Sequence, residues 1–328
     1  MDASEPARRA GALAAGVAET HVSVIVFIGD RAYKLKKAVD LGFLDFSTRE
    51  RREAACHEEI ALNRRLAPDV YLGVLDVVGA DGRPVDHLVE MRRMPSADRL
   101  STLLSSEPER AARGLRDVAR LVAAFHASAP RSEVIEGAAT AESMAGLWQR
   151  NREGMERFVG PVLPDEEVRA ADRLAAAFLA GRDALLAERI AAGRVVDGHG
   201  DLLADDIFLL PDGPRILDGI EFDDRLRHGD VVHDVAFLIM DLEHLGAPDL
   251  ARSFLEWYRE DAGDDPPASL VAWHVAYRAL VRAKIAALRH DQGDPAARAD
   301  AAALCTLAHR RLVEDQVRLV LVGGAPGT

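Results

Sequence analysis

Apolar and polar positions alternate over the first part of the chain in a way that predicts strands. Residues 22–39, VSVIVFIGDRAYKLKKAV, contain two β-rich runs that meet at Gly29-Asp30, a combination typical of a hairpin turn. Residues 70–94, VYLGVLDVVGADGRPVDHLVEMRRM, form a second hairpin pattern that turns at Ala80-Asp81-Gly82. We therefore expect four antiparallel strands before residue 95.

Helical spacing interrupts and surrounds these strands. Residues 47–68, STRERREAACHEEIALNRRLAP, begin with a Ser/Thr cap, carry apolar residues at partly helical spacing and stop at Pro68. The Ala-rich residues 1–19 also favour a helix.

Beyond Pro95 the pattern becomes mainly helical. An amphipathic helix is expected over residues 115–129, with further helices up to about residue 192 and a looser stretch over 130–165. Residues 195–224, VVDGHGDLLADDIFLLPDGPRILDGIEFDD, are strand-like around a PDG turn, and helices follow to residue 318. The whole pattern predicts an α+β fold with a small β-rich part and a larger helical part.

Composition narrows the class of protein. A formal net charge of −13 over 328 residues argues against nucleic acid as a partner, because phosphate backbones attract basic surfaces. The charge would suit a cationic small substrate, but a solvated acidic surface is the simpler explanation and the favoured one. Two widely spaced cysteines, no signal-peptide pattern and no apolar run long enough to span a membrane predict a cytoplasmic protein without a membrane segment.

The acidic residues around the PDG turn form a candidate metal site. If IFLL and RILD pair across PDGP, Leu210 lies opposite Arg215 and Ile207 opposite Asp218, which places Asp206 beside Asp218. Asp201 enters the same end of this hairpin. Three converging carboxylates repel one another unless a cation neutralises them, and hard oxygen ligands suit Mg²⁺. The alternative is that they are ordinary turn aspartates.

A lysine cluster in the first hairpin is the second chemical feature. The chain has four lysines, and three of them lie in the segment AYKLKK. Lys34 and Lys36 share one face of a strand, and Glu59 lies on the helix that follows. A lysine that binds nucleotide phosphates needs a carboxylate to position its flexible stem, and this pair supplies one. Taken singly, each of these residues reads as an exposed surface charge.

The order of these parts resembles the protein-kinase-like fold, and specifically the aminoglycoside phosphotransferase family of small-molecule kinases. The resemblance rests on AYKLKK, the Glu59 helix, HGDLLADDI and ILDGIEF, and it covers residues 20–318. HGDLLADDI matches the pattern HGDLxxxN except that Asp206 stands in the Asn position. The resemblance implies a bilobal fold, with residues 1–94 as the N-lobe and residues 95–318 as the C-lobe that carries the catalytic loop and metal-binding hairpin.

The same resemblance implies roles for individual residues. Asp201 would accept the proton of the substrate hydroxyl, and His199 would support its loop by hydrogen bonding. Asp206 and Asp218 would bind the metal. The nucleotide would be held by Lys34, with Lys36 as the register alternative, by its partner Glu59, and by an adenine-binding hinge at Glu90, Met91 and Arg92.

The resemblance predicts an ATP- and Mg²⁺-dependent phosphotransferase that acts on a hydroxyl of an aminoglycoside-like or amino-sugar-like molecule. Three departures weaken it: Asp206 replaces Asn and adds negative charge, Leu203 stands where a bacterial subgroup of this family often has His, and the turn ETHVS offers no glycine-rich phosphate loop. The alternative is a catalytically weak or inactive nucleotide-binding module that regulates a fused P-loop domain.

The C-terminal residues bear on that alternative. Segments such as YKLKKAVDLGFLDFSTRERR resemble a bacterial subgroup in which this domain is fused to a P-loop kinase or ATPase domain. Residues 319–328, LVLVGGAPGT, read as a strand and the start of GxxxxGK[ST]. We expect a longer protein with a P-loop domain after this point; a Gly-rich tail is the alternative.

Overall fold

The computed structural model describes residues 16–19, 22–40 and 44–316. Contacts group them into two compact units. The first contains the described residues up to Pro130 together with Val196–His228 and Glu256–Ala262, and the second contains the remainder. Residues 319–328, where a P-loop domain was expected to begin, lie outside the described part.

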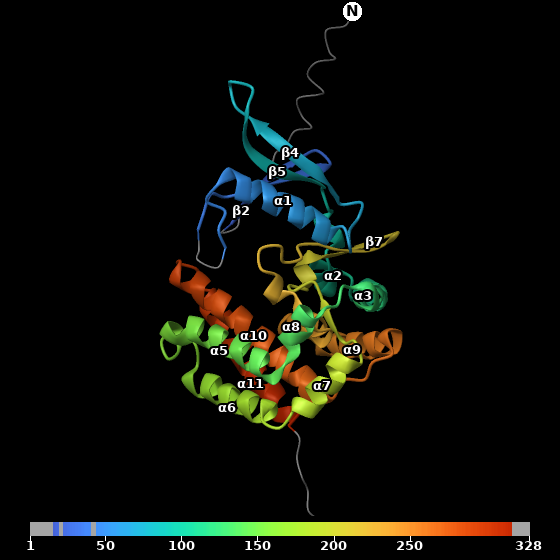
Figure 1. The fold of residues 1–328 in the computed structure, drawn as a ribbon, viewed down its shortest axis with the longest axis vertical. Helices are drawn as coiled ribbons and strands as arrows, with labels where there is room; N and C mark the ends of the chain where they lie inside the picture. Colours follow the sequence, from blue (N-terminus) through green and yellow to red (C-terminus); the bar gives the residue numbers. More distant parts are fainter. Residues whose placement is uncertain (1–15, 20–21, 41–43, 317–328) are drawn as a thin grey trace, which may run out of the picture. The chain divides into compact units, whose positions relative to one another are not determined.

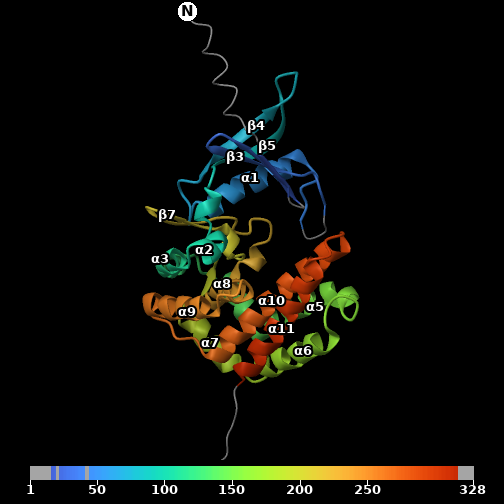
Figure 2. The same cartoon turned by 180° about the vertical axis from the view of Figure 1, so that it is seen from behind.

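The first unit is built on a five-stranded antiparallel sheet of order β1-β2-β3-β5-β4. Its strands are β1 (Gly16–Glu19), β2 (Ser23–Ile28), β3 (Arg31–Lys36), β4 (Tyr71–Val78) and β5 (Pro84–Arg92). Figure 1 shows α1 (Arg49–Asn63) lying along β4 and β5, and Figure 2 shows the sheet from behind with β3 beside them. Both predicted hairpins are therefore confirmed, with Gly29 and Gly82 at positive φ in their turns.

The expectation of a helix over residues 1–19 is wrong for its described part. Gly16–Glu19 is strand β1, which pairs with β2 from Gly16↔Phe27 to Glu19↔Val24. Helix propensity is a weak local preference, and pairing with the edge of an existing sheet outweighs it here.

Helix α1 follows the sequence pattern closely. The side chain of Thr48 accepts a hydrogen bond from the backbone N–H of Arg51, which satisfies one of the free donors at the helix start. Its buried face, which includes Cys56 and Ile60, packs with Val89 and Met91 of β5 into one apolar core. This packing holds Glu59, on the same helix, against the sheet.

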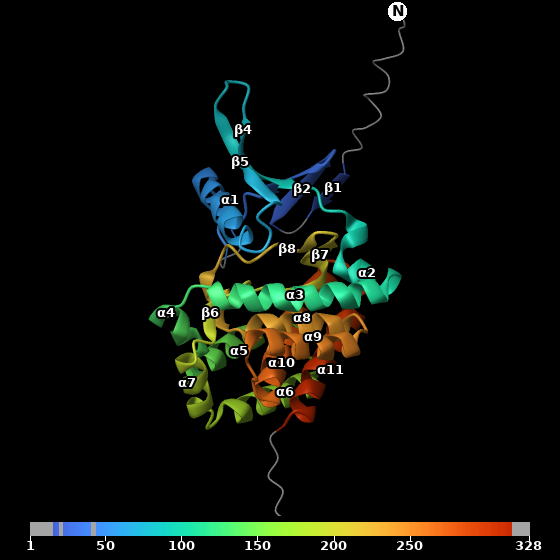
Figure 3. The same ribbon diagram turned by 90° about the vertical axis from the view of Figure 1, so that its right-hand side faces the viewer.

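Short elements and two helices complete the first unit. They are η2 (Ser96–Asp98), α2 (Leu100–Ser106), α3 (Pro108–Ser128), η5 (Ala204–Asp206), β7 (Ile207–Leu210), β8 (Gly213–Ile216) and η6 (Asp224–Leu226). Figure 3 shows α3 along its length with β7 and β8 next to it. Gly114 of α3 faces Leu209 of β7, where an added Cβ would come within 2.3 Å of a leucine methyl. The missing side chain therefore allows the close approach that supports this hairpin.

The second unit is mainly helical. It contains α4 (Glu133–Glu136), η3 (Gly137–Ala139), α5 (Ala141–Met155), η4 (Glu156–Phe158), α6 (Asp165–Leu179), α7 (Asp183–Ala191), α8 (Val232–His244), α10 (Ala268–Asp291) and α11 (Ala297–Glu314). Strands β6 (Val195–Asp197) and β9 (His228–Asp230) and helix α9 (Pro248–Ala262) extend across the boundaries between the units.

The stretch 130–165 was expected to be loose, and the structure corrects this. Thr140 caps α5 through the N–H of Ser143, and the Trp148 indole of α5 donates a hydrogen bond of 2.9 Å to Asp172 of α6. The capping and packing signals are spread over short segments, so no single long apolar period marks them.

A buried ion triad fixes the second unit. The guanidinium of Arg189 donates to both carboxylate oxygens of Asp230 at 2.7 Å, and to Asp264 at 2.5 and 2.9 Å. Bidentate pairing of this kind satisfies the donors of a buried arginine on two sides. The triad therefore joins α7, the end of β9 and the loop before α10.

Candidate functional site

Two lysines of β3 converge on one carboxylate of α1. Alternation along the strand places Lys34 and Lys36 on the same face. The Lys34 ammonium lies 2.8 Å from one oxygen of Glu59, and the Lys36 ammonium lies 2.7 Å from the other. Lys34 and Lys36, which the sequence presented as alternatives, therefore both bind the predicted partner Glu59.

The environments of the two lysines differ. Lys36 is 1% exposed and is also bound by Glu221, whose carboxylate lies 2.5 Å from the ammonium. Lys34 instead reaches Asp218 at 2.6 Å and lines a cavity. Only Lys34 of the two can meet a ligand in that cavity, whereas Lys36 compensates charge behind it.

Charge balance controls protonation in this cluster. Burial opposes the ionisation of Glu59, but Lys34 and Lys36 outweigh it and lower the pKa of the carboxyl group. Burial likewise opposes the charge on Lys34, yet Asp218 and Glu59 raise the pKa of its ammonium well above its ordinary value. Lys34 and Glu59 are therefore both ionised at neutral pH.

The hairpin that carries the acids forms, with a different register from the predicted one. Ile207 pairs with Ile216 and Leu210 with Gly213, so the turn has two residues rather than four. Gly213, at φ 123°, already belongs to β8. A shift of two residues keeps every side chain on its expected face, because strand side chains repeat with a period of two. The predicted pairing of Ile207 with Asp218 is therefore wrong, but Asp206 still lies near Asp218, as that pairing implied.

Asp206 and Asp218 lie at the open end of this hairpin. The backbone N–H of Leu217 donates to the carbonyl of Asp206 at 3.0 Å, and Asp218 follows directly. Asp218 has φ 67° and is the one non-glycine residue with positive φ in the described part of the chain. Strained backbone at such a position persists because surrounding contacts hold it, and it is common at functional sites.

Two buried side chains provide those contacts. The N–H of Asp218 donates to the Tyr71 hydroxyl at 3.1 Å, and the N–H of Gly219 donates to Asn63 Oδ1 at 2.8 Å. The Asn63 amide in turn donates to the carbonyl of Glu59 at 2.8 Å. The end of α1 is thereby joined to the loop of Asp218.

We expect Tyr71→Phe to lower the free energy of unfolding by about 1–3 kcal/mol, because the N–H of Asp218 loses its acceptor. Urea unfolding measures the loss. Tyr33→Phe, on β3, is the matched control, since no hydrogen bond from the Tyr33 hydroxyl is described. Equal effects of the two substitutions would contradict the role of the Tyr71 contact.

The loop that precedes the hairpin holds His199 and Asp201. The Nε2 atom of His199 lies 3.2 Å from the carbonyl oxygen of Leu217, and Nδ1 lies 3.3 Å from the backbone nitrogen of Asp201. A carbonyl only accepts and a backbone N–H only donates, so Nε2 donates to Leu217 and Nδ1 accepts from Asp201. His199 thereby connects the loop of Asp201 to the residue that follows β8, Leu217.

Asp206 is crowded by other acids. Burial raises the pKa of Asp206 well above its ordinary value of 3.8, and Asp218, Asp201 and Asp205 raise it further. Asp218 has the opposite shift, because Lys34 lowers its pKa. Asp201 and Asp218 thus both act on Asp206, and of Asp206 and Asp218 the less stable charge is the one at Asp206.

We expect Asp206→Asn to stabilise the ligand-free protein at neutral pH by on the order of 1 kcal/mol. A carboxyl group with a raised folded-state pKa favours folding below the unfolded pKa, and this contribution is lost as pH rises through the folded pKa. Asparagine does not titrate, so its advantage should shrink as pH is lowered from about 8 to about 4. Urea unfolding with EDTA present measures it, and a gain independent of pH would contradict the explanation.

A cavity of about 710 Å³ opens beside these groups. Its apolar lining includes Ala32, Met91, Phe208 and Leu217, and Lys34, Asp206 and Asp218 provide charged groups. This volume lies within the range of small-molecule sites. An apolar slot that leads to one lysine and two acids can hold a flat apolar ring and a charged tail.

The predicted hinge residues are placed unequally. Met91 and Arg92 line the cavity, whereas Glu90 is not among the lining residues and forms an ion pair of 3.4 Å with Arg31. The carboxylate of Glu90 is thus engaged on the neighbouring strand.

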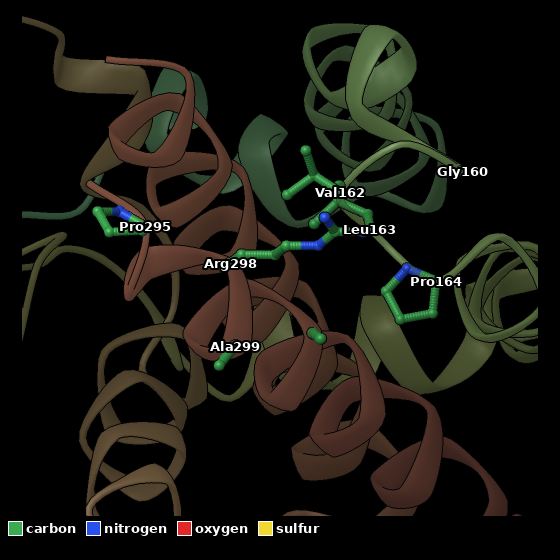
Figure 4. A pocket seen from close by; sticks show the side chains of 8 residues that line it. Gly160, Val162, Leu163, Pro164, Pro295, Arg298 and Ala299 are labelled. Atoms are coloured by element: carbon green, nitrogen blue, oxygen red, sulfur yellow. The ribbon is translucent and has the colours of Figure 1, made fainter. Parts of the chain in front are cut away.

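A second hollow, of about 500 Å³, lies in the second unit between the loop before α6 and the start of α11. Figure 4 shows its lining, in which Arg298 lies among Val162, Leu163, Pro164 and Pro295. Arg298 is its one charged lining residue, so it lacks the acids and bases of the first cavity.

No group of three or more His, Cys, Asp or Glu side chains in the described residues is arranged closely enough to hold a metal ion as it stands. The donor chemistry nevertheless fits a hard cation. Asp206 and Asp218 offer carboxylate oxygens, and burial together with the neighbouring acids raises the pKa of Asp206, an effect that a bound cation would oppose. A substrate phosphate would supply the remaining ligands.

Sequence reasoning missed Glu221, Tyr71 and Asn63. Glu221 lies in ILDGIEF, and an acid so close to Asp218 in the chain was a usable signal. Tyr71 and Asn63 meet the Asp218 loop across sequence separations of 147 and 156 residues. No local pattern marks contacts of that range.

Comparison of the sequence with known proteins finds relatives but no matching family. No family model matches the chain. Uncharacterized proteins of Mycobacterium tuberculosis and Mycobacterium bovis are 42% identical to it over 313 residues, which are 95% of this chain and 62% of each relative. The chain thus spans about three fifths of the length of the curated relatives it matches.

Solved kinase structures share the architecture. A choline/ethanolamine kinase family protein from Mesorhizobium loti has a TM-score of 0.52 at 14% identity and covers 95% of both chains. The GDP and kanamycin complex of APH(2")-IIia has a TM-score of 0.54 at 15% identity and covers 92% of both chains. A thermostable mutant of aminoglycoside phosphotransferase APH(4)-Ia gives 0.52 at 16% identity, over 92% of this chain and 96% of that one.

The predicted fold class is therefore confirmed: a protein-kinase-like α+β fold with a small antiparallel sheet in its N-terminal region and a larger helical part. Among the helices of the described residues, none is long and apolar enough to cross a membrane.

Proposed function

We propose that the chain is an ATP- and Mg²⁺-dependent phosphotransferase that acts on a hydroxyl group of a small molecule. The observation that carries this proposal is the position of Lys34. Its ammonium lies between Glu59 and Asp218 at the charged end of an apolar cavity. A fixed ammonium beside metal-binding acids is the arrangement that phosphoryl transfer requires, since its catalysis is positioning and electrostatic stabilisation.

The cavity suits a nucleotide in one orientation. The base would lie in the slot lined by Ala32, Met91, Phe208 and Leu217, where stacking and burial favour a flat ring. The phosphates would extend toward Lys34. Asp206 and Asp218 would hold Mg²⁺, which neutralises phosphate charge and orients the transferred group.

Asp201 would act on the acceptor. Its carboxylate would take the proton of the substrate hydroxyl as that oxygen bonds to the γ-phosphorus and the bond to the β-phosphate oxygen breaks, which leaves ADP and the phosphate ester. His199 keeps the backbone of Asp201 fixed through its Nδ1 contact. The acceptor we propose is a cationic amino alcohol or amino sugar, because the chain has a net charge of −13.

The alternative function remains a nucleotide-binding module that regulates a fused P-loop domain. Asp206 in the Asn position favours it, since an extra carboxylate repels the phosphates. The greater length of the mycobacterial relatives leaves room for another domain in those proteins. Both the fused P-loop domain and the cytoplasmic location stay predictions.

Thermal shift and turnover assays separate these functions. The purified protein would be tested with ATP or GTP, with and without Mg²⁺, against choline, ethanolamine and kanamycin as acceptors. Mg²⁺-dependent nucleotide binding with release of a phosphate ester supports the enzyme. Binding without transfer to any acceptor supports the regulatory module, and the absence of nucleotide binding overturns both.

A further inference from the structure

We propose that Arg93 and Arg99 form an arginine rim on the cavity of the first unit that binds a phosphate carried on the ribose of the nucleotide. This inference rests on the proposed function, because it assumes a nucleotide in the cavity. It adds an anion-binding subsite to the proposed subsites for the base and the phosphate chain, and it defines the class of nucleotide that the protein prefers.

The charges that line the cavity point to a missing anion. Four cationic side chains line it, namely Lys34, Arg92, Arg93 and Arg99, beside three acids, Asp30, Asp206 and Asp218. This is a local excess of positive groups in a chain whose net charge is −13. Two of the four cations are already compensated: Lys34 by its carboxylate partners, and Arg92 by Asp69 at 3.1 Å.

Arg93 lacks such compensation. Within the described residues it forms no ion pair; its guanidinium lies 3.4 Å from the carbonyl oxygen of Gly29 and 5.2 Å from the centre of the Phe27 ring. Stacking on an aromatic face orients a guanidinium while leaving its edge donors available. The side chain is therefore held in place with donors to spare.

Arg99 is in a similar position. Its nearest carboxylate, on exposed Asp205, is 3.8 Å away, which is longer than a hydrogen bond. Its Nε atom is buried and has no hydrogen-bond partner, and its guanidinium stacks 5.3 Å from the centre of the Phe208 ring. The Arg99 side chain is nevertheless 40% exposed, so the terminal nitrogens of its guanidinium can meet a ligand oxygen.

The two stacking rings belong to different walls. Phe27 lies on β2 of the five-stranded sheet and Phe208 on β7 of the hairpin, and both line the cavity. The rim thus has one arginine associated with each wall. Planar guanidinium groups match the oxygens of a phosphate, which favours this anion over a single point charge.

The position of Arg93 and Arg99 in the chain indicates that the rim faces the ribose of the nucleotide. Lys34, Asp206 and Asp218 would engage the 5′-phosphate chain, and Met91 lies beside the base. Arg93 and Arg99 follow the end of β5, whose last residue is Arg92, and so belong to the segment after the base-binding strand. The remaining part of a nucleotide is its ribose edge, with the 2′ and 3′ oxygens.

Isothermal titration with matched nucleotides tests this proposal. AMP is compared with adenosine 3′,5′-bisphosphate and adenosine 2′,5′-bisphosphate, which differ from it by one ribose phosphate. We expect at least one bisphosphate to bind the wild-type protein about tenfold or more tightly than AMP, and the gain to fall as salt is added. Arg93→Gln and Arg99→Gln should each reduce the gain, and the double variant should abolish it.

Arg83→Gln, in the exposed β4–β5 turn, is the control for net charge and should keep the full gain. Thermal unfolding confirms that each variant is folded. Equal affinity of AMP and both bisphosphates in the wild type, or a gain unchanged in the double variant, overturns the rim while the proposed nucleotide site survives. If inorganic phosphate at matched concentration binds the rim without any nucleotide preference, the ribose assignment is wrong. If AMP and ADP both fail to bind, the proposed function itself fails.

Discussion

Asp201→Asn is expected to lower the rate of phosphate transfer about 10²–10⁴-fold, the usual contribution of a general base. The substitution keeps the shape of the side chain and removes its ability to take a proton. Asp201 is not among the residues that line the cavity, so nucleotide affinity should change little. A fall in kcat with an unchanged dissociation constant for ATP separates a role in proton transfer from a role in binding.

Single-turnover assays with the best acceptor from the panel measure this effect. Asp81→Asn, in the exposed turn between β4 and β5, is the matched control and should transfer phosphate at the wild-type rate. A transfer rate within threefold of wild type in Asp201→Asn would remove Asp201 from the mechanism, since a bystander carboxylate would behave in this way.

The local parts of this site were predictable because each depends on short-range rules. Turn residues at Gly29-Asp30 located one hairpin, alternation placed Lys34 and Lys36 on one face, and chain order placed Glu59 on the following helix. The α+β class followed from the same patterns. These features need no knowledge of distant partners.

The missed parts all depend on long-range pairing. Strand β1 forms because β2 offers an edge, which the Ala-rich composition of residues 1–19 does not reveal. The register of β7 and β8 depends on a two-residue turn in place of a four-residue one. Glu221 meets Lys36 across 185 residues. Such contacts are selected by packing in three dimensions, so a sequence pattern constrains them only weakly.

Removal of the Glu59 charge is expected to have the largest effect on stability. Glu59 is fully buried and is the shared partner of Lys34 and Lys36. Breaking a buried pair by removing one partner leaves an uncompensated charge, which costs about 3–5 kcal/mol. Glu59→Gln should therefore lower the free energy of unfolding at neutral pH by that amount, although the amide fits the same space.

The pH dependence of this loss identifies its origin. The folded-state pKa of Glu59 lies below its ordinary value of 4.5, so its ionised form stabilises the fold above that value, and the contribution is lost as pH falls through the folded pKa. Glutamine does not titrate, so the difference between wild type and Glu59→Gln should shrink as acid is added. Urea unfolding at several pH values measures it. Glu58→Gln, on the exposed face of the same helix, should change stability by less than about 0.5 kcal/mol. A deficit for Glu59→Gln that stays constant into acid would show that lost packing, rather than lost charge, destabilises the variant.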